Sequence, residues 1–575
     1  MLEIVDLASL PERAEIEVTL AAWHVAEWGH LYDPAAWNAT LAADELRAMT
    51  GDGLPRTLVA LDDGGAPVGS ASLLVTDDLP GWAQTGPWLA SLFVAPRWRG
   101  HGIGGRLVDA CMALARSSDV DDVHLFTAGQ APWYLARGWR VVGTADANGV
   151  AVDVLARRTS PRAARRSIVS RWVTDTDVGG AYSFLRPGGT PADRAALGAE
   201  LLDGLWMAGE HTSVDGPGTM HGAWASGVRA GGAVLAAGHR QAFVIGAGLA
   251  GLAAARQLVD AGAEVCVLEA GSNIGGRAAT DRSLGWPANL GGAWLHGNAG
   301  HPLDDHVTSV PWAWERTTAF VDGTGALDAA GRARLLAARI AVDDALDAAA
   351  DPRHDVAVGP VLRAAVAALD EPPVVLAALG GWLRGEFENQ YAAPVDELSL
   401  VNRAEPYHLD GGDHLITSGI DSFTAAVADG LDVRLGERVV ALRRDRDGWT
   451  ATTAMGGRVT GPAVVVTVPL PVLQRDVIAV DPPLPTTVVE ALARMACGPV
   501  AKVFATFDEA FWAPHRAFWV VGEARRALEL FVDASESAGR PALCAFASGR
   551  FAADVESMTE DERCRLVDAT LSVLP

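Results

Sequence analysis

The sequence contains almost no lysine, few cysteines and no long hydrophobic run. Of its 46 basic residues only Lys502 is a lysine, and its five cysteines include no C-x-x-C pair. An odd number of scattered cysteines disfavours both a disulfide framework and a structural zinc site, so we expect no metal centre. A reduced, cytoplasmic environment is the expected location.

The lack of hydrophobic runs bears on membrane association. No stretch reaches the roughly 18–20 uninterrupted apolar residues that span a bilayer. The opening segment, MLEIVDLASLPERAEIE, carries acidic residues and lacks the apolar core of a signal peptide. We therefore expect no association with a membrane.

Positive charge is also scarce, because the formal net charge is −25. A nucleic-acid backbone needs a basic surface, so nucleic acid is not an expected partner. An acidic surface instead favours cationic substrates or partners. The chain is 49% hydrophobic and 20% charged, which is typical of a globular protein, and its 575 residues suggest three or four domains of about 100–200 residues.

The pattern along the chain changes after about 160 residues. Residues 4–157 alternate helical and strand-like segments, with strands expected at 57–61, 68–75 and 88–95 and a helix at 105–116. The stretch 158–167, RTSPRAARRS, is polar and contains proline, so it is predicted to be a linker.

A glycine fingerprint follows in the second part of the chain. FVIGAGLAGL, residues 243–252, places Gly246, Gly248 and Gly251 in G-x-G-x-x-G spacing between a strand and a helix. These glycines permit a tight turn, close approach of a pyrophosphate and close packing of helix on strand. Glu269 ends the next strand, where a carboxylate accepts hydrogen bonds from a ribose. The pattern predicts a dinucleotide site.

Further motifs accompany this fingerprint: IGGR at 274–277, NLGGAWLHG at 289–297, GGDHLITSG at 411–419 and VTVPL at 466–470. As a set they resemble the flavin-containing amine oxidases, which include monoamine oxidases, polyamine oxidases and lysine-specific histone demethylases. The resemblance spans about 168–575. It implies FAD-dependent oxidation of an amine C–N bond, with hydride transfer to flavin N5, imine formation and reoxidation by O2 to H2O2.

The order of the motifs differs from that of the family. AGEHTS at 208–213 and PGTMHGAWASG at 217–227 resemble the segment that closes the family's chain, yet here they precede the fingerprint. We infer a circular permutation, in which 168–235 is the family's C-terminal piece. An alternative is that this piece completes a neighbouring chain.

The resemblance also implies roles for individual residues. Lys502, which follows Gly498, matches the lysine that is bonded through water to flavin N5. Tyr182 matches one of two aromatics that flank the substrate amine, and the other position holds Thr219. Ala181 stands where monoamine oxidases attach the flavin to a cysteine, so we expect non-covalent FAD. Further cofactor contacts are expected from Gly209, Glu210, Met220, Gly276, Arg277 and Val439.

An amino-acid oxidase remains an open alternative. That branch needs an arginine placed for the substrate carboxylate. Arg316, Arg363 and Arg384 are present in the substrate-binding part, and the sequence does not identify one of them for this role.

The N-terminal part carries a different motif. VAPRWRGHGIG, residues 94–104, resembles motif A of the GCN5-related acetyltransferases. A loop of backbone N–H groups and a helix N-terminus make an anion cradle there, which in that family holds the pyrophosphate of acetyl-CoA. The residues expected to bind acetyl-CoA are Arg99, Gly100, Gly102 and Gly104.

The acetyltransferase resemblance also suggests catalytic groups. WYLARGW, residues 133–139, resembles the element whose tyrosine protonates the leaving thiolate, which makes Tyr134 the candidate acid. The strand before motif A lacks the usual carboxylate, since it reads LASL at 89–92. Glu27 and His24, on an early helix, are the substitutes considered as general base.

These observations predict a bifunctional enzyme of mixed α/β and α+β multidomain fold, with a small-molecule amine, O2 and acetyl-CoA as reactants. The alternative is an FAD amine or amino-acid oxidase whose acetyltransferase-like domain only binds or regulates. The oligomeric state stays open, with a homodimer as one option. The expected domains are an acetyltransferase-like domain (1–157), a linker (158–167), a Rossmann-like FAD-binding domain (168–300 and 405–475) and a substrate-binding domain (301–404 and 476–575).

Overall fold

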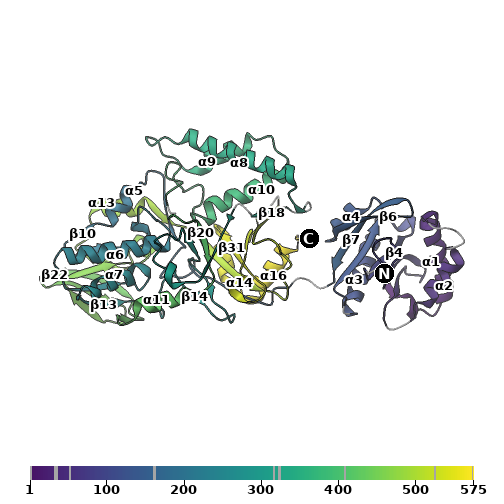
Figure 1. Cartoon of the computed structure of the whole chain (residues 1–575), viewed down its shortest axis with the longest axis horizontal. Coiled ribbons are helices and arrows are strands. Elements are labelled where there is room, and N and C mark those ends of the chain that lie inside the picture. Colours follow the sequence, from purple (N-terminus) through teal and green to yellow (C-terminus); the bar gives the residue numbers. More distant parts are fainter. Residues whose placement is uncertain are drawn as a thin grey trace. The chain divides into compact units, whose positions relative to one another are not determined.

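The computed structural model divides the chain into two compact units, Met1–Arg162 and Ala163–Leu574 (Figure 1). Each unit has its own sheets and its own buried core. The residues described are 3–31, 37–50, 53–83, 85–118, 120–159, 163–314, 317–321, 325–406, 409–522, 526–572 and 574.

The first unit is built on a seven-stranded sheet in the order β1-β2-β3-β4-β5-β7-β6. Neighbouring strands are antiparallel except β4 and β5, which run parallel and pair through Trp88 and His124. The strands are β1 (Glu3–Asp6), β2 (Arg56–Leu61), β3 (Pro67–Leu74), β4 (Trp88–Val94), β5 (Asp122–Thr127), β6 (Arg140–Ala147) and β7 (Val150–Arg158). The helices are α1 (Arg13–Trp28), α2 (Ala39–Ala48), α3 (Ile103–Ser117) and α4 (Ala131–Leu135).

Helix α3 shows why this part of the sequence folds as predicted. Its apolar residues recur at helical spacing, and Leu107, Val108 and Cys111 are buried in the core formed with the sheet. The helix begins directly after Gly102, whose φ of +77° suits glycine. The three predicted strands and this helix are confirmed to within two residues.

The predicted linker, 158–167, is shorter in the structure. Strand β7 continues through Arg158, and β8 (Arg166–Val169) begins one residue before the expected end of the linker. Strand β8 pairs with β28 (Val500–Thr506), with Ile168 opposite Phe504. The arginine-rich composition is misleading here, because Arg166 belongs to an edge strand and forms an ion pair with Glu560 at 2.7 Å.

The second unit contains a six-stranded sheet in the order β10-β11-β25-β12-β13-β21. All of its pairings are parallel except that of β10 with β11. Its strands are β10 (Glu200–Leu202), β11 (Leu205–Met207), β12 (Gln241–Ile245), β13 (Glu264–Leu268), β21 (Asp432–Arg434) and β25 (Ala463–Val466). Helices packed nearby are α6 (Met220–Ala236), α7 (Leu249–Asp260) and α11 (Asp421–Ala428).

The segment that precedes the glycine fingerprint lies within this same unit. Strand β11 pairs with β25, and α6 runs beside α7 (Figure 1). A Cβ on Gly227 of α6 would lie 2.1 Å from the Ala250 carbonyl oxygen, so the two helices approach as closely as glycine allows. Residues upstream of the fingerprint therefore complete the sheet of their own chain.

A second large sheet of this unit has the order β19-β18-β29-β30-β31-β28-β8. Helical segments adjoin it: α8 (Ala329–Ala349), α9 (Val358–Ala367), α10 (Pro373–Arg384) and the π-helical turn η7 (Gly385–Asn389). The three α-helices lie in a segment, 329–384, that is rich in alanine and leucine. The remaining strands of the sheet are β18 (Thr318–Val321), β19 (Gly325–Ala326), β29 (Ala517–Val521), β30 (Leu530–Asp533) and β31 (Ala542–Ser548).

Smaller elements connect the two sheets. The strands are β9 (Ser183–Leu185), β14 (Thr280–Asp281), β15 (Ala288–Asn289), β16 (Trp294–His296), β17 (Ser309–Pro311), β20 (Asp413–Ile416), β22 (Val439–Asp445), β23 (Gly448–Thr453), β24 (Arg458–Gly461), β26 (Ala479–Asp481) and β27 (Met495–Cys497). The helices are α5 (Pro191–Leu197), α12 (Leu470–Gln474), α13 (Thr486–Ala493), α14 (Ser535–Ala538), α15 (Arg550–Ser557) and α16 (Glu560–Leu571).

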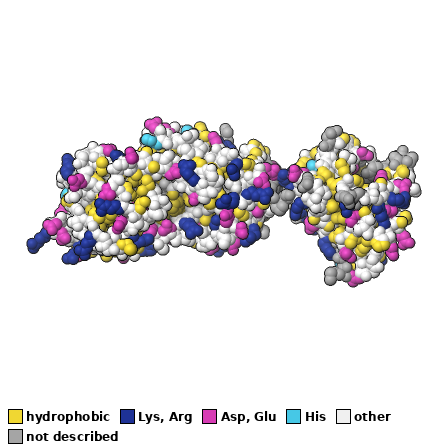
Figure 2. All heavy atoms as spheres, turned by 90° about the horizontal axis from the view of Figure 1, so that it is seen from below, with side chains coloured by type: hydrophobic (Ala, Val, Ile, Leu, Met, Phe, Trp, Pro, Cys, Tyr) yellow, Lys and Arg dark blue, Asp and Glu magenta, His cyan; other side chains and the backbone are white. Residues whose placement is uncertain are grey.

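The surface drawn in Figure 2 carries arginine and acidic side chains interspersed with one another. Within the described ranges, no helix combines the length and the apolar character that crossing a membrane requires. The described residues also contain no group of three or more His, Cys, Asp or Glu that could hold a metal ion.

Candidate active site

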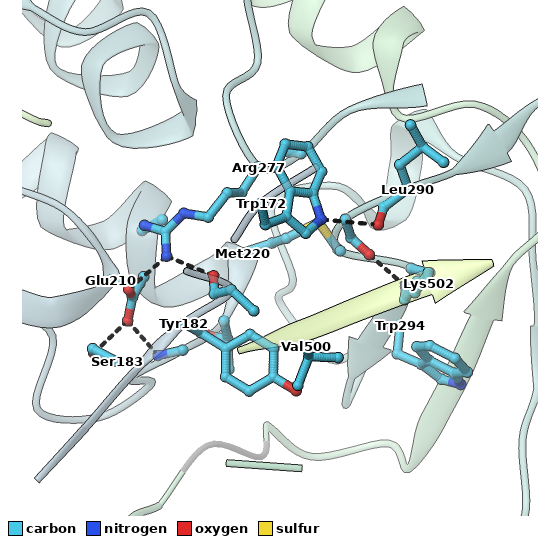
Figure 3. A pocket seen from close by; sticks show the side chains of 18 of the residues that line it. Trp172, Tyr182, Ser183, Glu210, Met220, Arg277, Leu290, Trp294, Val500 and Lys502 are labelled. Atoms are coloured by element: carbon cyan, nitrogen blue, oxygen red, sulfur yellow. Dashed lines mark hydrogen bonds and ion pairs between the residues drawn. The ribbon is translucent and has the colours of Figure 1, made fainter. Parts of the chain in front are cut away.

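A cavity of about 1430 Å³ lies in the second unit. Ligand pockets usually measure about 300–1,000 Å³, so this one has room for more than one small molecule. Its walls come from the parallel sheet, from β28 and β31 of the second large sheet, and from α8, α10 and η7. Figure 3 shows Ser183 and Glu210 at one side, Lys502 and Trp294 at the other, and Tyr182 and Val500 between them.

The glycine fingerprint forms the turn between β12 and α7 at one end of this cavity. Gly246 has a φ of +103°, which favours glycine. A Cβ on Gly251 would lie 1.9 Å from the Gly246 carbonyl oxygen, whereas a Cβ on Gly248 would have the Gly275 carbonyl oxygen as its nearest neighbour, at 4.0 Å. Gly248 therefore leaves open space at the N-terminus of α7, where backbone N–H groups bind phosphate in other proteins.

Glu269 stabilises this turn through hydrogen bonds. Its Oε2 accepts the Ala247 N–H at 2.7 Å, and its Oε1 accepts the Gly271 N–H at 2.7 Å. A carboxylate offers about four acceptor positions, so both oxygens retain capacity for ribose hydroxyls. Gly276 packs closely against the turn, because a Cβ there would lie 3.3 Å from the Gly248 Cα. The arrangement fits the diphosphate and ribose of a dinucleotide.

Glu210 and Arg277 form an ion pair in the same cavity. Arg277 Nη1 donates to Glu210 Oε1 at 3.0 Å and to the Ala181 carbonyl at 2.7 Å, and Ser183 Oγ donates to Glu210 Oε2 at 2.7 Å (Figure 3). Burial opposes ionisation of Glu210, but the charge of Arg277 and the bond from Ser183 lower its pKa to about 2. The carboxylate is therefore ionised and holds Arg277 against the backbone.

Three other expected cofactor contacts, Gly209, Met220 and Val439, also line the cavity. Gly209 has a φ of +142°, and a Cβ there would lie 2.5 Å from the His211 ring. Met220 begins α6, next to the segment that carries Gly292. Apart from Gly251, which packs against the Gly246 carbonyl within the turn, the residues expected at the flavin site all line this one cavity.

Thr219 lines the cavity, but its hydroxyl is engaged elsewhere. Its Oγ1 accepts the Gly222 N–H at 3.0 Å and donates to the Gly216 carbonyl at 2.8 Å. Thr219 is therefore the N-cap of α6, and its proposed place beside the substrate rests on its position alone.

Lys502 lies on β28 and lines the same cavity as the glycine turn. Its Nζ donates to the Gly291 carbonyl at 2.5 Å, and it lies 5.0 Å from the centre of the Trp294 ring. Burial lowers the pKa of Lys502 to about 8. The amino group can therefore gain or lose a proton near neutral pH.

Aromatic side chains surround this part of the cavity. The Tyr182 hydroxyl donates to the Asn389 carbonyl, and burial raises the pKa of Tyr182. Trp294 contacts Trp314, with ring centres 5.4 Å apart, and Phe546 at 6.1 Å. These rings give the site near Lys502 apolar walls, which exclude water and suit the alkyl part of a substrate.

The arginines considered for a substrate carboxylate do not line the cavity where they are described. Arg384 pairs with Glu529, and Arg363 pairs with Asp396 at 2.9 Å. Arg316 lies outside the described residues. The guanidinium groups on the α8 wall belong instead to Arg332 and Arg339, which the sequence did not single out.

In the first unit, the glycine loop precedes α3 as expected. Gly100 and Gly102 have φ of +84° and +77°, and a Cβ on either would meet open space. Arg99 Nε donates to the Val94 carbonyl at 2.9 Å. A Cβ on Gly104 would lie 3.6 Å from the Trp133 ring, so α4, which carries Tyr134, lies beside the start of α3. Burial raises the pKa of Tyr134 to about 12.

The two candidate bases of this unit occupy different environments. Glu27 is exposed and its Oε2 lies 3.4 Å from Arg99 Nη2. His24 is buried, its Nε2 lies 2.9 Å from Ser70 Oγ, and burial lowers its pKa to about 4. His24 is thus neutral at pH 7 and hydrogen-bonded within the core, while Glu27 accompanies the glycine loop.

Several cavity residues escaped the sequence reasoning. Trp172 donates its Nε1–H to the Leu290 carbonyl at 3.1 Å, and Asp413 accepts from Trp314 at 3.1 Å and from His296 at 3.2 Å. Trp294 and His296 lie within the GGAWLHG motif, which offered a signal. Glu386 and Asn389 belong to no sequence motif; they reach the cavity from the π-helical turn η7.

Comparison with known proteins agrees with this geometry. The family model described as "Flavin containing amine oxidoreductase" matches residues 155–235, 249–309 and 371–575. That of the "Acetyltransferase (GNAT) family" matches residues 19–132.

Three individual proteins illustrate the similarity. Polyamine oxidase 4 of Oryza sativa subsp. japonica is 32% identical over 348 residues, which cover 56% of this chain and 71% of that protein. Lysine-specific histone demethylase 1 homolog 1 of the same plant is 30% identical over 364 residues, 57% of this chain and 42% of that protein. A solved structure of putrescine oxidase bound to putrescine covers 58% of this chain and 81% of its own, at 21% identity and a TM-score of 0.46. With a GNAT acetyltransferase domain ahead of its oxidoreductase part, the chain belongs to the flavin-containing amine oxidoreductase family.

Proposed function

We propose that the second unit is an FAD-dependent oxidase of an amine C–N bond. The observation that carries the proposal is the single cavity that joins the glycine turn and Glu269 to Lys502 and Tyr182. The turn and Glu269 would hold the diphosphate and a ribose of a dinucleotide, and the volume of the cavity leaves room for a substrate beside it. The names of the relatives make a polyamine the first substrate class to test.

The residues of the chain prepare this site for amine oxidation. FAD, when bound, supplies the acceptor for the hydride and passes the electrons to O2. Lys502 holds a proton donor at Nζ, oriented by the Gly291 carbonyl. Tyr182 is fixed through its hydroxyl to Asn389, and its ring and Trp294 exclude water from the reacting amine. Arg277, anchored by Glu210, supplies positive charge to the cofactor end.

Two features support non-covalent FAD and a permuted chain. Ala181, whose carbonyl accepts from Arg277, has no sulfur to join to a flavin. The family match begins with 155–235, upstream of the fingerprint, and β11 from this piece pairs with β25. We therefore interpret the Rossmann-like FAD-binding domain as circularly permuted, with 168–235 as the family's C-terminal piece.

For the first unit we propose N-acetyl transfer from acetyl-CoA. The open glycine loop at the start of α3 and the neighbouring Tyr134 support it, with Glu27 as the base nearer to the loop. The alternative is that this unit only binds or regulates. Calorimetric titration of acetyl-CoA into the full chain measures binding to the first unit. Absence of binding would contradict both functions. Acetylation of a diamine that Tyr134→Phe slows supports transfer, and binding without transfer supports the alternative.

The oxidase proposal is tested by anaerobic mixing with amines, acetylated amines and α-amino acids while the flavin absorbance is followed. Bleaching by an amine class supports the proposal. Bleaching by α-amino acids alone favours the amino-acid oxidase. A protein that takes up no FAD contradicts the proposal.

A further inference from the structure

One buried carboxylate, that of Glu556, holds the loop that carries Trp172. Glu556 lies in the last turn of α15 and is 3% exposed. Its Oε2 accepts the Thr174 N–H at 2.8 Å, the Thr174 hydroxyl at 2.9 Å and the Val173 N–H at 3.1 Å. The carboxylate and Thr174 are 382 residues apart in the sequence, so only the folded chain brings them together.

These hydrogen bonds offset the cost of placing a charge at this position. Burial raises the pKa of Glu556, whereas the hydrogen bonds from Thr174 and Val173 lower it. The C-terminal end of a helix also disfavours a negative charge, because its carbonyl groups carry partial negative charge. A buried carboxylate that lost these donors would pay a large desolvation penalty. The loop and the carboxylate therefore hold each other in one arrangement.

The loop places Trp172 against the backbone that orients Lys502. The Trp172 Nε1–H donates to the Leu290 carbonyl at 3.1 Å, beside Lys502 (Figure 3). A Cβ on Gly291 would lie 3.3 Å from the Trp172 ring. The Gly291 carbonyl in turn accepts from Lys502 Nζ at 2.5 Å. Displacement of the indole would therefore release the backbone that sets the direction of the Lys502 amino group.

A second set of contacts joins the same stretch of chain to Lys502. Ser170, two residues before Trp172, accepts the Lys502 N–H at its Oγ, over 3.0 Å. The Ser170 N–H donates to the Lys502 carbonyl, also at 3.0 Å. Both residues are buried. Residues 170–174 thus contact the backbone of Lys502 directly and, through Trp172, the acceptor of its amino group.

We propose that Glu556 is a positioning residue for the oxidation: through Trp172 it holds the Gly291 carbonyl where that carbonyl orients the Lys502 amino group. The inference rests on the proposed role of Lys502 in amine oxidation. Among the described residues Glu556 does not line the cavity, so it acts through Trp172. Misplacement of a catalytic group by about 1 Å can slow an enzyme about 100-fold.

The experiment uses the fact that Lys502 is the only lysine in the chain. Lysine labelled with ¹³C at Cε, incorporated into the full chain, gives one NMR signal, and its shift follows protonation of Nζ. Loss of the Gly291 acceptor removes a hydrogen bond to the charged form. Glu556→Ala should therefore lower the titration midpoint by about half to one pH unit. Trp172→Phe, which removes the indole N–H, should lower it similarly.

Two further variants separate positioning from the charge of Glu556 itself. Glu556→Gln removes the charge but keeps an oxygen that accepts from Thr174, so its midpoint should stay near that of wild type. A midpoint as low as that of Glu556→Ala would assign the effect to charge and overturn the inference. Glu560→Gln is the matched control, because Glu560 accepts the Ser167 N–H at 3.1 Å in the preceding strand. It should leave the midpoint unchanged, and an equal fall would also overturn the inference.

The double variant and the melting temperature complete the test. Glu556→Ala combined with Trp172→Phe should lower the midpoint no further than either change alone, because both act through one contact. Additive effects would contradict this order of contacts. If Glu556→Ala does not fold, Glu556→Asp, whose shorter side chain weakens the same hydrogen bonds, takes its place. Trp172→Phe tests the link to Lys502 independently of Glu556.

The inference and the proposed oxidation fail in different ways. With an amine that reduces the flavin, Glu556→Ala should lower turnover about 10- to 100-fold and leave the Kd of the amine within about twofold. The NMR titration needs no substrate, so it decides the inference even if no amine reduces the flavin and the proposed oxidation fails. Wild-type midpoints in Glu556→Ala and Trp172→Phe overturn the inference and leave the oxidation standing.

Discussion

The charged side chains at the two ends of the large cavity differ in whether they have partners. At the end formed by the glycine turn, Arg277 is paired with Glu210 and Glu269 is bonded to two backbone N–H groups. At the wall formed by α8, α10 and η7, Glu386 and Arg339 lie near each other without an ion pair in the described part of the chain.

The two ends thus differ in whether their charged side chains are paired within the protein. A buried charge without a partner is costly, so a protein keeps one where a ligand supplies the partner. At the paired end, the charges of Glu210, Arg277 and Glu269 already have partners, and the glycine turn leaves backbone N–H groups open to a ligand. The wall near Glu386 keeps a carboxylate whose pKa is raised by burial, and no ion pair to it is found among the described residues.

The largest effect is expected from breaking the paired end. Glu210→Ala leaves Arg277, whose side chain is 21% exposed, without its counter-ion; fully buried pairs lose about 3–5 kcal/mol, and we expect a smaller loss here because of this exposure. We expect loss of bound flavin and a lower free energy of unfolding, measured by absorbance and urea titration. Glu397→Ala removes a partner from the exposed pair with Arg186 and serves as the control, with an expected change below about 1 kcal/mol. A Glu210→Ala protein that keeps its flavin and stability would contradict this view of the paired end.

The next effect concerns Lys502, which lies on β28 and lines the same cavity. Lys502→Met removes the proton donor near the reacting amine, and we expect turnover to fall about 100-fold or more. Lys502→Arg, which keeps the charge in a different shape, should restore little activity. Turnover within a few-fold of wild type in both variants would exclude a catalytic role.

Lys502 also predicts a pH dependence of stability. The pKa is about 8 in the folded protein and 10.5 ordinarily. Between these values the unfolded chain binds more protons, so the free energy of unfolding of wild type, relative to Lys502→Met, rises with pH in this window. Denaturant titrations at pH 7, 9 and 10.5 measure it, and parallel curves would refute the burial of an ionisable Lys502.

The sequence allowed the paired end to be predicted because its residues form local motifs. Gly246, Gly248, Gly251 and Glu269 lie within one strand–turn–helix–strand unit, where spacing alone determines their neighbours. The wall containing Glu386 could not be predicted in this way. Its residues come from α8, α10, η7 and β29, and only the folded chain brings them to one surface.

Two individual residues show the limits of the motif reading. Thr219 occupies the position of a family aromatic, yet its hydroxyl caps α6, a role that threonine before a helix often takes. Arg166 was assigned to a linker by composition, whereas strand pairing with β28 places it at a sheet edge. For Arg166, strand pairing replaced the role suggested by composition, whereas the place of Thr219 beside the substrate stays a prediction.

The smallest effect is expected from Thr219. Thr219→Ala removes the N-cap of α6 and should lower the free energy of unfolding by about 1 kcal/mol. Thr219→Ser keeps the hydroxyl and should retain most of the stability. Turnover should change little in either variant, and a large loss of turnover at unchanged stability would instead place Thr219 in the chemistry.

The most direct test of the central claim is a crystal structure of the flavin-loaded protein. The account predicts the diphosphate at the turn formed by Gly246, Gly248 and Gly251, a ribose on Glu269, and the flavin ring system reaching Lys502 and Tyr182. Flavin bound elsewhere, or a ring system directed away from Lys502, would contradict it.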